Sequence, residues 1–519
     1  MTPTSAAGPS ADAAAAPSIL FLHPADRAAA EAASEPDCFS DLNLDQVMAA
    51  ITASRQDADL RGFFHAPLDD LDAVRYRQEV FRDLRPEARA AFSAFCAAMR
   101  GVRGLLAERL DHRYQRESWF FEAAETYVRA VRALADALGR LEPESRALRR
   151  LRDYLADYVA SDAFRSLADD GSAVRTALNA VRYNLRIGNG RVTVGQEAPG
   201  PDYTVEIEAL FARFRRQPAR DDRQAFSVDP DLSHARILDR IARLHPEAFG
   251  ALDAFMARHR PFLDPILASL DREVQFYLAY LDFLDRFAER GLPTCEPRVS
   301  RDGHELQARE VYDVALASRL SAEGRPIVTN DVALTGPERI LVVTGPNQGG
   351  KTTFARAFGQ LLYLASLGCP VPAADAQLPL CDRVFTQFGR EERLDEQRSR
   401  LEDELLRLRS ILEVATSRSA LVLNEVFSST TLADAVSLSL DLLARIEALD
   451  LIGVWVTFVD ELARVDDRTV SLVSNVRPDD PSIRTFKITR RAAEGRAYAA
   501  SIAAKYGVSY ERLRDRLSS

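Results

Sequence analysis

The sequence predicts a mainly α-helical core domain followed by an α/β domain with a largely parallel sheet. Between about residues 40 and 325, apolar side chains recur at spacings of three and four, as on long amphipathic helices. After about residue 326, short β-branched runs alternate with helical stretches, which is typical of a parallel sheet with helical crossovers. This change of pattern predicts a helical core over residues 39–325 and an α/β domain over residues 326–519.

Composition sets limits on the class of protein. The 519 residues are 47% hydrophobic and 28% charged, and their net charge of -10 argues against a wholly basic nucleic-acid binder, although a local basic face is compatible with it. No continuous apolar run reaches the roughly 18 residues of a membrane span. The five cysteines have no CxxC spacing, which argues against a zinc site and favours free thiols in a reducing compartment. We therefore expect a soluble, cytoplasmic protein with no membrane partner.

Along the first half, most segments are predicted to be helical. Residues 148–159 and 263–281 repeat apolar side chains at helical spacing, whereas residues 1–38 are rich in Ala, Pro and Ser and predict a disordered tail. An insertion is expected near residues 160–230, in which "IGNGRVTVGQEAPGPDYTVEIEAL" (187–210) predicts a short hairpin or irregular segment. Its arginines could contact phosphates nonspecifically, or they could cover a solvated helix face.

The α/β half begins with a phosphate-binding motif. The segment "VVTGPNQGGKTT" matches G-x-x-x-x-G-K-[ST] and stands between a predicted strand (339–344) and a predicted helix. Glycines let backbone N–H groups close around phosphate oxygens, a lysine reaches the β- and γ-phosphates, and a hydroxyl ligates Mg²⁺. We therefore expect this loop to bind ATP or another nucleoside triphosphate. The predicted binding residues are Gly345, Pro346, Asn347, Gln348, Gly349, Gly350, Lys351, Thr352 and Thr353.

An acidic strand end follows at "LVLNE", where many nucleotide hydrolases carry Asp-Glu and this chain carries Asn424-Glu425. The first residue of such a pair serves the Mg²⁺ ion, and the glutamate polarises the attacking water. The predicted metal-site residues are therefore Thr352, Asn424 and Glu425, and Glu425 and Lys351 are the predicted catalytic residues. Because Asn424 has no charge, we expect weaker Mg²⁺ binding rather than loss of hydrolysis.

These motifs resemble those of the MutS DNA mismatch-repair ATPases. "TGPNQGGKTT" is similar to the phosphate-binding loop (Walker A) of that family, in which Gly-Pro-Asn precedes Gly-Gly-Lys. The neighbouring segments occur in the same order, and the resemblance spans roughly residues 40–510. The segments that carry it are "APLDDLDAVRYRQEVFRDL" (66–84), "LGCPVPA" (367–373), "DRVFTQFG" (382–389), "ILEVATSRSALVLNE" and "GRAYAASIAAKYGVS" (495–509).

The resemblance implies an ABC-type P-loop ATPase that works as a homodimer, with ATP and Mg²⁺ held between two subunits. In the family, a serine from the partner subunit approaches the γ-phosphate, and Ser399 stands at that position as a third predicted catalytic residue. The chain keeps Thr430 and Asp434 but has Phe427-Ser428-Ser429 where the family has Gly-Arg-Gly. Phe458 also replaces a family histidine, so the coupling of hydrolysis to conformation is expected to differ.

The resemblance further implies a role in DNA repair or recombination through duplex or branched DNA, without sequence specificity. The family's mismatch-reading and connector domains have no counterpart before the helical core, so we do not expect a direct mismatch reader. Phe120-Phe121-Glu122 has the spacing of the family's Phe-x-Glu wedge, but its helical surroundings favour a core position. The alternative function is a slow ATP-gated interaction module with no DNA substrate. A transporter-type ABC ATPase is disfavoured because no "LSGG"-like signature precedes the acidic strand.

Overall fold

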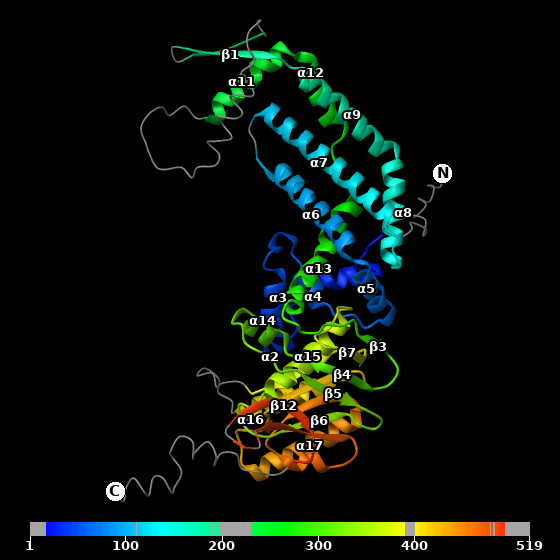
Figure 1. The fold of residues 1–519 in the computed structure, drawn as a ribbon, viewed down its shortest axis with the longest axis vertical. Helices are drawn as coiled ribbons and strands as arrows, with labels where there is room; N and C mark the ends of the chain where they lie inside the picture. Colours follow the sequence, from blue (N-terminus) through cyan, green and yellow to red (C-terminus); the bar gives the residue numbers. More distant parts are fainter. Residues whose placement is uncertain are drawn as a thin grey trace, which may run out of the picture. The chain divides into compact units, whose positions relative to one another are not determined.

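The computed structural model describes residues 17–109, 112–188, 191–196, 230–389, 400–477, 479–480 and 483–493. These residues form helices combined with two larger sheets and one hairpin (Figure 1). The chain divides into two compact units, and neither is continuous in sequence. The first unit comprises Met1–Arg89, Pro143–Leu151 and Arg272–Ser519, and the second comprises Ala90–Glu142 and Arg152–Asp271.

The second unit is mainly helical, as the sequence predicts. Its helices α7, α9 and α12 pack on one another, and Figure 1 shows α7 beside α9. Helices α6, α8 and α13 have residues in both units. The helices are α6 (Pro86–Ala107), α7 (Arg113–Arg140), α8 (Arg146–Ala160), α9 (Asp162–Asn179), α11 (Pro230–Leu244), α12 (Pro246–Arg258) and α13 (Pro265–Ala288).

Two predictions about this unit are confirmed. Phe120 and Phe121 are buried on α7, where Phe121 packs edge-on against Phe255 with ring centroids 5.4 Å apart. They are core residues, as the helical pattern predicts. The interruption after α9 is a hairpin of β1 (Tyr183–Gly188) paired antiparallel with β2 (Arg191–Gln196). The rest of the predicted insertion, residues 197–229, lies outside the described residues.

Helix α6 is long and apolar enough to cross a membrane, with a mean hydropathy of 1.2, and it is the one such helix in the described ranges. That criterion is also met by core helices of proteins that do not enter membranes. Phe92, Phe95, Met99 and Val102 of α6 are buried inside the protein. Packing therefore explains the large apolar side chains on the buried face of α6.

The first unit contains a six-stranded sheet in the order β12-β11-β6-β10-β9-β8. Five strands are parallel, and the edge strand β12 pairs antiparallel with β11. Five of the six strands lie at the β-branched runs that the sequence predicts, and β8 lies within the "DRVFTQFG" segment. The strands are β6 (Ile340–Thr344), β8 (Val384–Phe388), β9 (Ala420–Asn424), β10 (Ile452–Val456), β11 (Thr469–Val476) and β12 (Arg484–Arg490).

Helices cover both faces of this sheet. Helices α16 (Arg400–Val414) and α17 (Leu432–Leu449) share a hydrophobic cluster with Leu421, Leu423 and other strand residues. Because side chains alternate along a strand, Val422 points to the opposite face, where it lies close to Gly359 of α15 (Lys351–Ser366). The sheet is therefore buried on both sides, which explains why its strands are continuously apolar.

A four-stranded sheet in the order β3-β7-β4-β5 lies in the same unit. Strands β4 and β5 pair antiparallel across the predicted boundary near residue 325, so the structure differs from that boundary. These strands are short and alternate between buried and exposed positions, which hides them from a search for apolar runs. The elements are β3 (Arg298–Ser300), β4 (Leu306–Val311), α14 (Val314–Ala322), β5 (Asn330–Leu334) and β7 (Asp375–Pro379).

The prediction of a disordered tail is wrong for residues 17–38, which are the part of that segment that the structure describes. Ile19, Leu20 and Phe21 are buried, and the Glu273 carboxylate accepts hydrogen bonds from the Ser18 hydroxyl and the Ile19 N–H, both at 2.8 Å. Its Ala-rich stretch forms a helix because it packs on the rest of the unit. The elements here are α1 (Pro24–Ala32), α2 (Cys38–Leu42), α3 (Leu44–Thr52), η1 (Gln56–Ala58), α4 (Arg61–His65) and α5 (Leu71–Asp83), and η2 (Asp460–Arg464) follows β10.

Candidate nucleotide site

The candidate site begins where β6 turns into α15. Gly350 has a φ of +89°, a left-handed conformation that favours glycine, and it directly precedes the first residue of the helix. Gly349 lies against β11, where a Cβ atom would come within 2.3 Å of the Ser474 hydroxyl. That hydroxyl donates a hydrogen bond to the Gly349 carbonyl at 2.7 Å. The loop is thus held between its own strand and the neighbouring one, with the N-terminus of α15 at its end.

Lys351 points back into this loop. Its ammonium donates to the carbonyl oxygens of Gly345 at 3.0 Å and Pro346 at 3.1 Å, and the residue is only 7% exposed. Burial lowers the pKa of Lys351 below its ordinary value, while the nearby Glu425 carboxylate acts in the opposite direction. A buried positive charge surrounded by carbonyl oxygens can bind the phosphate of a ligand at the same place.

Thr352 and Asn424 meet across the ends of the central strands. The Thr352 hydroxyl donates to the Asn424 amide oxygen at 2.9 Å, and Asn424 is the buried last residue of β9. Glu425 follows in the left-handed region with a φ of +53°, and its N–H donates to the Val456 carbonyl of β10 at 2.9 Å. Its side chain is exposed and lines the cavity in front of the loop.

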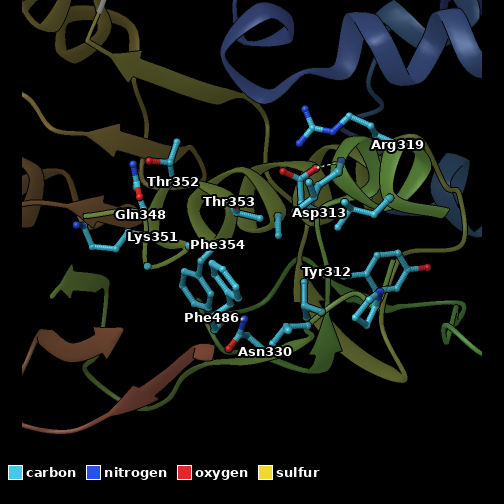
Figure 2. Close-up of a pocket in the computed structure, with 18 of the residues that line it drawn as sticks. Tyr312, Asp313, Arg319, Asn330, Gln348, Lys351, Thr352, Thr353, Phe354 and Phe486 are labelled. Atoms are coloured by element: carbon cyan, nitrogen blue, oxygen red, sulfur yellow. Dashed lines mark hydrogen bonds between the residues drawn. The ribbon is translucent and has the colours of Figure 1, made fainter. Parts of the chain in front are cut away.

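This cavity has a volume of about 620 Å³, within the usual range for small-molecule sites. In Figure 2, Lys351 and Thr352 lie at one end, Tyr312, Asp313 and Arg319 lie at the other, and Phe354 and Phe486 lie between them. The phosphate loop therefore opens onto a partly aromatic cavity. The sequence does not predict the lining residues from β12, from β5, from α14 and from the two residues that precede α14, because they lie outside the motif along the chain. They are Tyr312, Asp313, Arg319, Asn330 and Phe486.

Polar contacts fix the part of the cavity lining that is formed by Asp313, Asn330 and Phe486. Asp313 is buried, and its carboxylate accepts from the N–H groups of Ala315 and Leu316 at the start of α14 and from Gln360 of α15. Burial raises the pKa of Asp313 above its ordinary value. Asn330 accepts a hydrogen bond from the Ile488 N–H at 2.8 Å and donates to the Phe486 carbonyl at 3.1 Å. These bonds connect the second sheet to the cavity wall.

The predicted site residues are brought together in part. The loop residues 345–353 converge with Asn424 and Glu425, whereas Ser399 lies outside the described residues. Phe458 stands at the position where the family resemblance implies a histidine. It is 48% exposed and does not line the cavity. Thr430 donates a weak bond to Asp434 at 3.4 Å near the start of α17.

Comparison with known proteins agrees with this geometry. Residues 341–510 match the model of MutS domain V. The DNA mismatch repair protein MutS of Chlorobaculum tepidum is 33% identical over 273 residues, which cover 52% of this chain and 30% of that protein. Over this region the chain is similar to MutS proteins, and it spans about a third of the length of that relative. The match to domain V begins inside β6 and includes the phosphate loop, α15 and Asn424-Glu425.

The second candidate site is the arginine-rich stretch near residues 160–230, and the structure describes only part of it. Arg165 pairs with Asp162 at 3.0 Å, and Arg175 pairs with Glu122 at 2.9 Å and contacts Glu125 as well. These two guanidinium groups have carboxylate partners within their own unit. Residues 197–229 lie outside the described residues, so a phosphate-binding face here stays a prediction.

Proposed function

We propose that this MutS-like chain binds and hydrolyses ATP and that it acts on DNA in repair or recombination, without reading mismatches directly. The observation that supports it best is the 2.9 Å hydrogen bond between Thr352 and Asn424, because it joins the phosphate loop to the acidic strand end. The two segments are far apart in sequence, and their meeting beside Lys351 is what phosphoryl-transfer sites require.

The described residues fit a nucleoside triphosphate. Backbone N–H groups of the 345–350 loop and the start of α15 can receive phosphate oxygens, and Lys351 can exchange its loop carbonyl partners for the β- and γ-phosphates. The cavity beyond the loop offers Phe486 and Tyr312 as aromatic surfaces for the nucleoside. Two contacts hold β12 beside β5 at the edge of this cavity. Lys487 of β12 contacts the Thr329 carbonyl, and Asn330 of β5 donates to the Phe486 carbonyl.

The residues at the end of β9 also fit Mg²⁺, although they carry one negative charge fewer than an Asp-Glu pair would. The Thr352 hydroxyl and the Asn424 amide supply adjacent neutral oxygens, and Glu425 supplies the nearby carboxylate. Bound with the nucleotide, Mg²⁺ would neutralise negative charge on the phosphates. We assign Glu425 to orient and polarise the attacking water, and we expect Asn424 to make hydrolysis slower and more dependent on Mg²⁺ concentration.

We further propose that two copies of the chain dimerise through their ATPase regions, so that Ser399 of one copy serves the site of the other. The support is the family resemblance around Ser399 together with the open front of the cavity at the exposed Glu425. A local basic face of the helical unit would contact DNA phosphates, without base-specific contacts.

Steady-state ATP hydrolysis tests this function most broadly. We expect slow basal hydrolysis whose rate changes when duplex, mismatched or four-way-junction DNA is added. We also expect DNA affinity to fall steeply as salt is raised, because phosphate contacts release counterions. ATP hydrolysis that responds to none of these DNAs, together with no DNA binding at low salt, would favour the alternative of an ATP-gated interaction module. The neutral Asn424 and the exposed Phe458 are the features compatible with that alternative.

A further inference from the structure

We propose that Glu404 is a positioning residue for hydrolysis and that it fixes the turn that carries Glu425. The inference rests on the proposed ATPase function and adds a residue that the phosphate-binding and acidic motifs do not contain. It derives from a hydrogen-bonded connection between helix α16 and the residues just after β9, within the first unit.

The turn after β9 is conformationally strained. Glu425 and Phe427 both lie in the left-handed region, with φ values of +53° and +61°. Each such residue costs on the order of 1 kcal/mol or more when it is neither glycine nor asparagine, so surrounding contacts must hold it in place. Phe427 gains part of that stabilisation by burying its ring in the cluster beneath α16 and α17, where it is 1% exposed.

Glu404 supplies the polar part of that stabilisation. It is 4% exposed, and its Oε2 atom accepts a hydrogen bond from the Phe427 N–H at 3.0 Å. Its Oε1 atom accepts from Arg400 Nε at 3.3 Å, one turn earlier on α16. Arg400 in turn donates to the Ser428 hydroxyl at 3.2 Å. The helix thus holds two consecutive residues of the turn.

The position of these contacts gives them a functional consequence. Phe427 is two residues after Glu425, so the orientation of the Glu425 carboxylate depends on the dihedral angles that Glu404 helps to fix. Misplacing a catalytic group by about 1 Å can lower a rate by up to about a hundredfold. Helix α16 begins at Arg400, so the residues that contact the Glu425 turn stand in its first two turns.

If Glu404 only stabilised the fold, its removal would affect the protein in the same way as removal of another buried carboxylate. Glu117 on α7 is an equivalent buried carboxylate, since it is also 4% exposed and accepts a bond from an arginine one turn away, Arg113, at 2.6 Å. No bond from Glu117 to the Glu425 turn is found among the described residues. Removing either carboxylate should lower stability, but only removal of Glu404 should change the chemical step.

The test compares Glu404→Ala, Glu404→Gln and the control Glu117→Ala in the full chain, well below the unfolding temperature of each variant. We expect Glu404→Ala to lower kcat by about tenfold to a hundredfold, while the Kd for ATP changes less than about twofold. Glu404→Gln should restore most of kcat, because its amide oxygen can still accept from the Phe427 N–H. Glu117→Ala should leave kcat and Kd unchanged.

An unchanged kcat in Glu404→Ala, or equal losses of kcat in Glu404→Ala and Glu117→Ala, would overturn the proposal. If Glu404→Ala does not fold, Glu404→Asp replaces it, because the shorter side chain keeps the charge but cannot reach Phe427, and the same loss of kcat is expected. Failure of the proposed ATPase function itself would look different. In that case the unmodified chain would hydrolyse no ATP, or Lys351→Ala would hydrolyse it at the unmodified rate.

Discussion

Asn424 is the residue at which this site differs most clearly in charge from the Asp-Glu pair that many nucleotide hydrolases carry. Its amide oxygen takes the bond from Thr352 and thus preserves the geometry of the strand end. What it removes is one negative charge next to the predicted metal position. We therefore expect this difference to affect the affinity for Mg²⁺.

Asn424→Asp should lower the Mg²⁺ concentration needed for half-maximal ATP hydrolysis by about tenfold, because an added carboxylate raises the affinity of an oxygen site for a hard cation. A Mg²⁺ titration of the steady-state rate measures this shift. Asn179→Asp adds the same charge at an exposed position at the end of α9 and serves as the control. Equal titration curves for Asn424→Asp and the unmodified chain would remove Asn424 from the metal site.

Among individual residues, the sequence predicts those that belong to a local motif and misses those that come from elsewhere in the chain. Lys351 and Thr352 are predictable because a strand, a glycine loop and a helix start follow one another directly. Tyr312 and Asn330 reach the same cavity through the second sheet, and Glu404 reaches the Glu425 turn through α16. Their positions depend on packing between distant segments, for which a single sequence carries no short-range pattern.

At the level of elements, the segment before α1 shows how a distant buried group can order a chain of low complexity. Glu273 on α13 accepts bonds from Ser18, Ile19 and Leu20 and pairs with Arg27. The composition of residues 1–38, which are rich in Ala, Pro and Ser, predicts disorder. The prediction fails because the apolar residues Ile19 to Phe21 are buried against the remainder of the first unit.

Glu273 also makes a pH-dependent contribution to stability. Burial raises its pKa above the ordinary value, so the folded chain binds a proton more tightly than the unfolded chain. This contribution is present below the unfolded pKa and is lost as pH rises through the folded pKa, so the free energy of unfolding should decrease over that range. Glu273→Gln should show a smaller decrease over the same range in urea denaturation. Identical pH profiles for the two proteins would contradict this assignment.

The strands of the six-stranded sheet were predictable because burial on both faces makes them apolar throughout. The strands of the second sheet were not, since β4 has the exposed-face alternation of a half-buried strand and is interrupted by an irregular register near Ala308 and Val311. That sheet connects residues before and after position 325. A boundary placed from the change in hydrophobic pattern alone therefore cuts through a folded unit.

Across the whole molecule, the two units combine segments from different parts of the chain, and the candidate nucleotide cavity lies entirely in the first. We propose that two copies dimerise when ATP is bound to that unit, because the cavity is open where Glu425 is exposed. Coupling between units and copies then depends on whether nucleotide is bound or hydrolysed.

Sedimentation velocity should therefore detect dimers of Glu425→Gln when ATP and Mg²⁺ are present and monomers when they are absent. The substitution removes the group that polarises water and leaves the nucleotide bound, which prolongs the dimer. Lys351→Ala should stay monomeric under both conditions, since its loop loses the charge that binds phosphate. A sedimentation coefficient of Glu425→Gln that is the same with and without ATP would contradict nucleotide-dependent dimerisation.

We propose that the loop of residues 345–353 and the Glu425 turn together form an ATP-hydrolysing site. The most direct test of this proposal is the steady-state rate of ATP hydrolysis by the purified chain, by Lys351→Ala and by Glu425→Ala, with Mg²⁺ in excess. We predict slow hydrolysis by the unmodified chain and a rate at background level for both variants. Hydrolysis by either variant at the rate of the unmodified chain would contradict the assignment of this site.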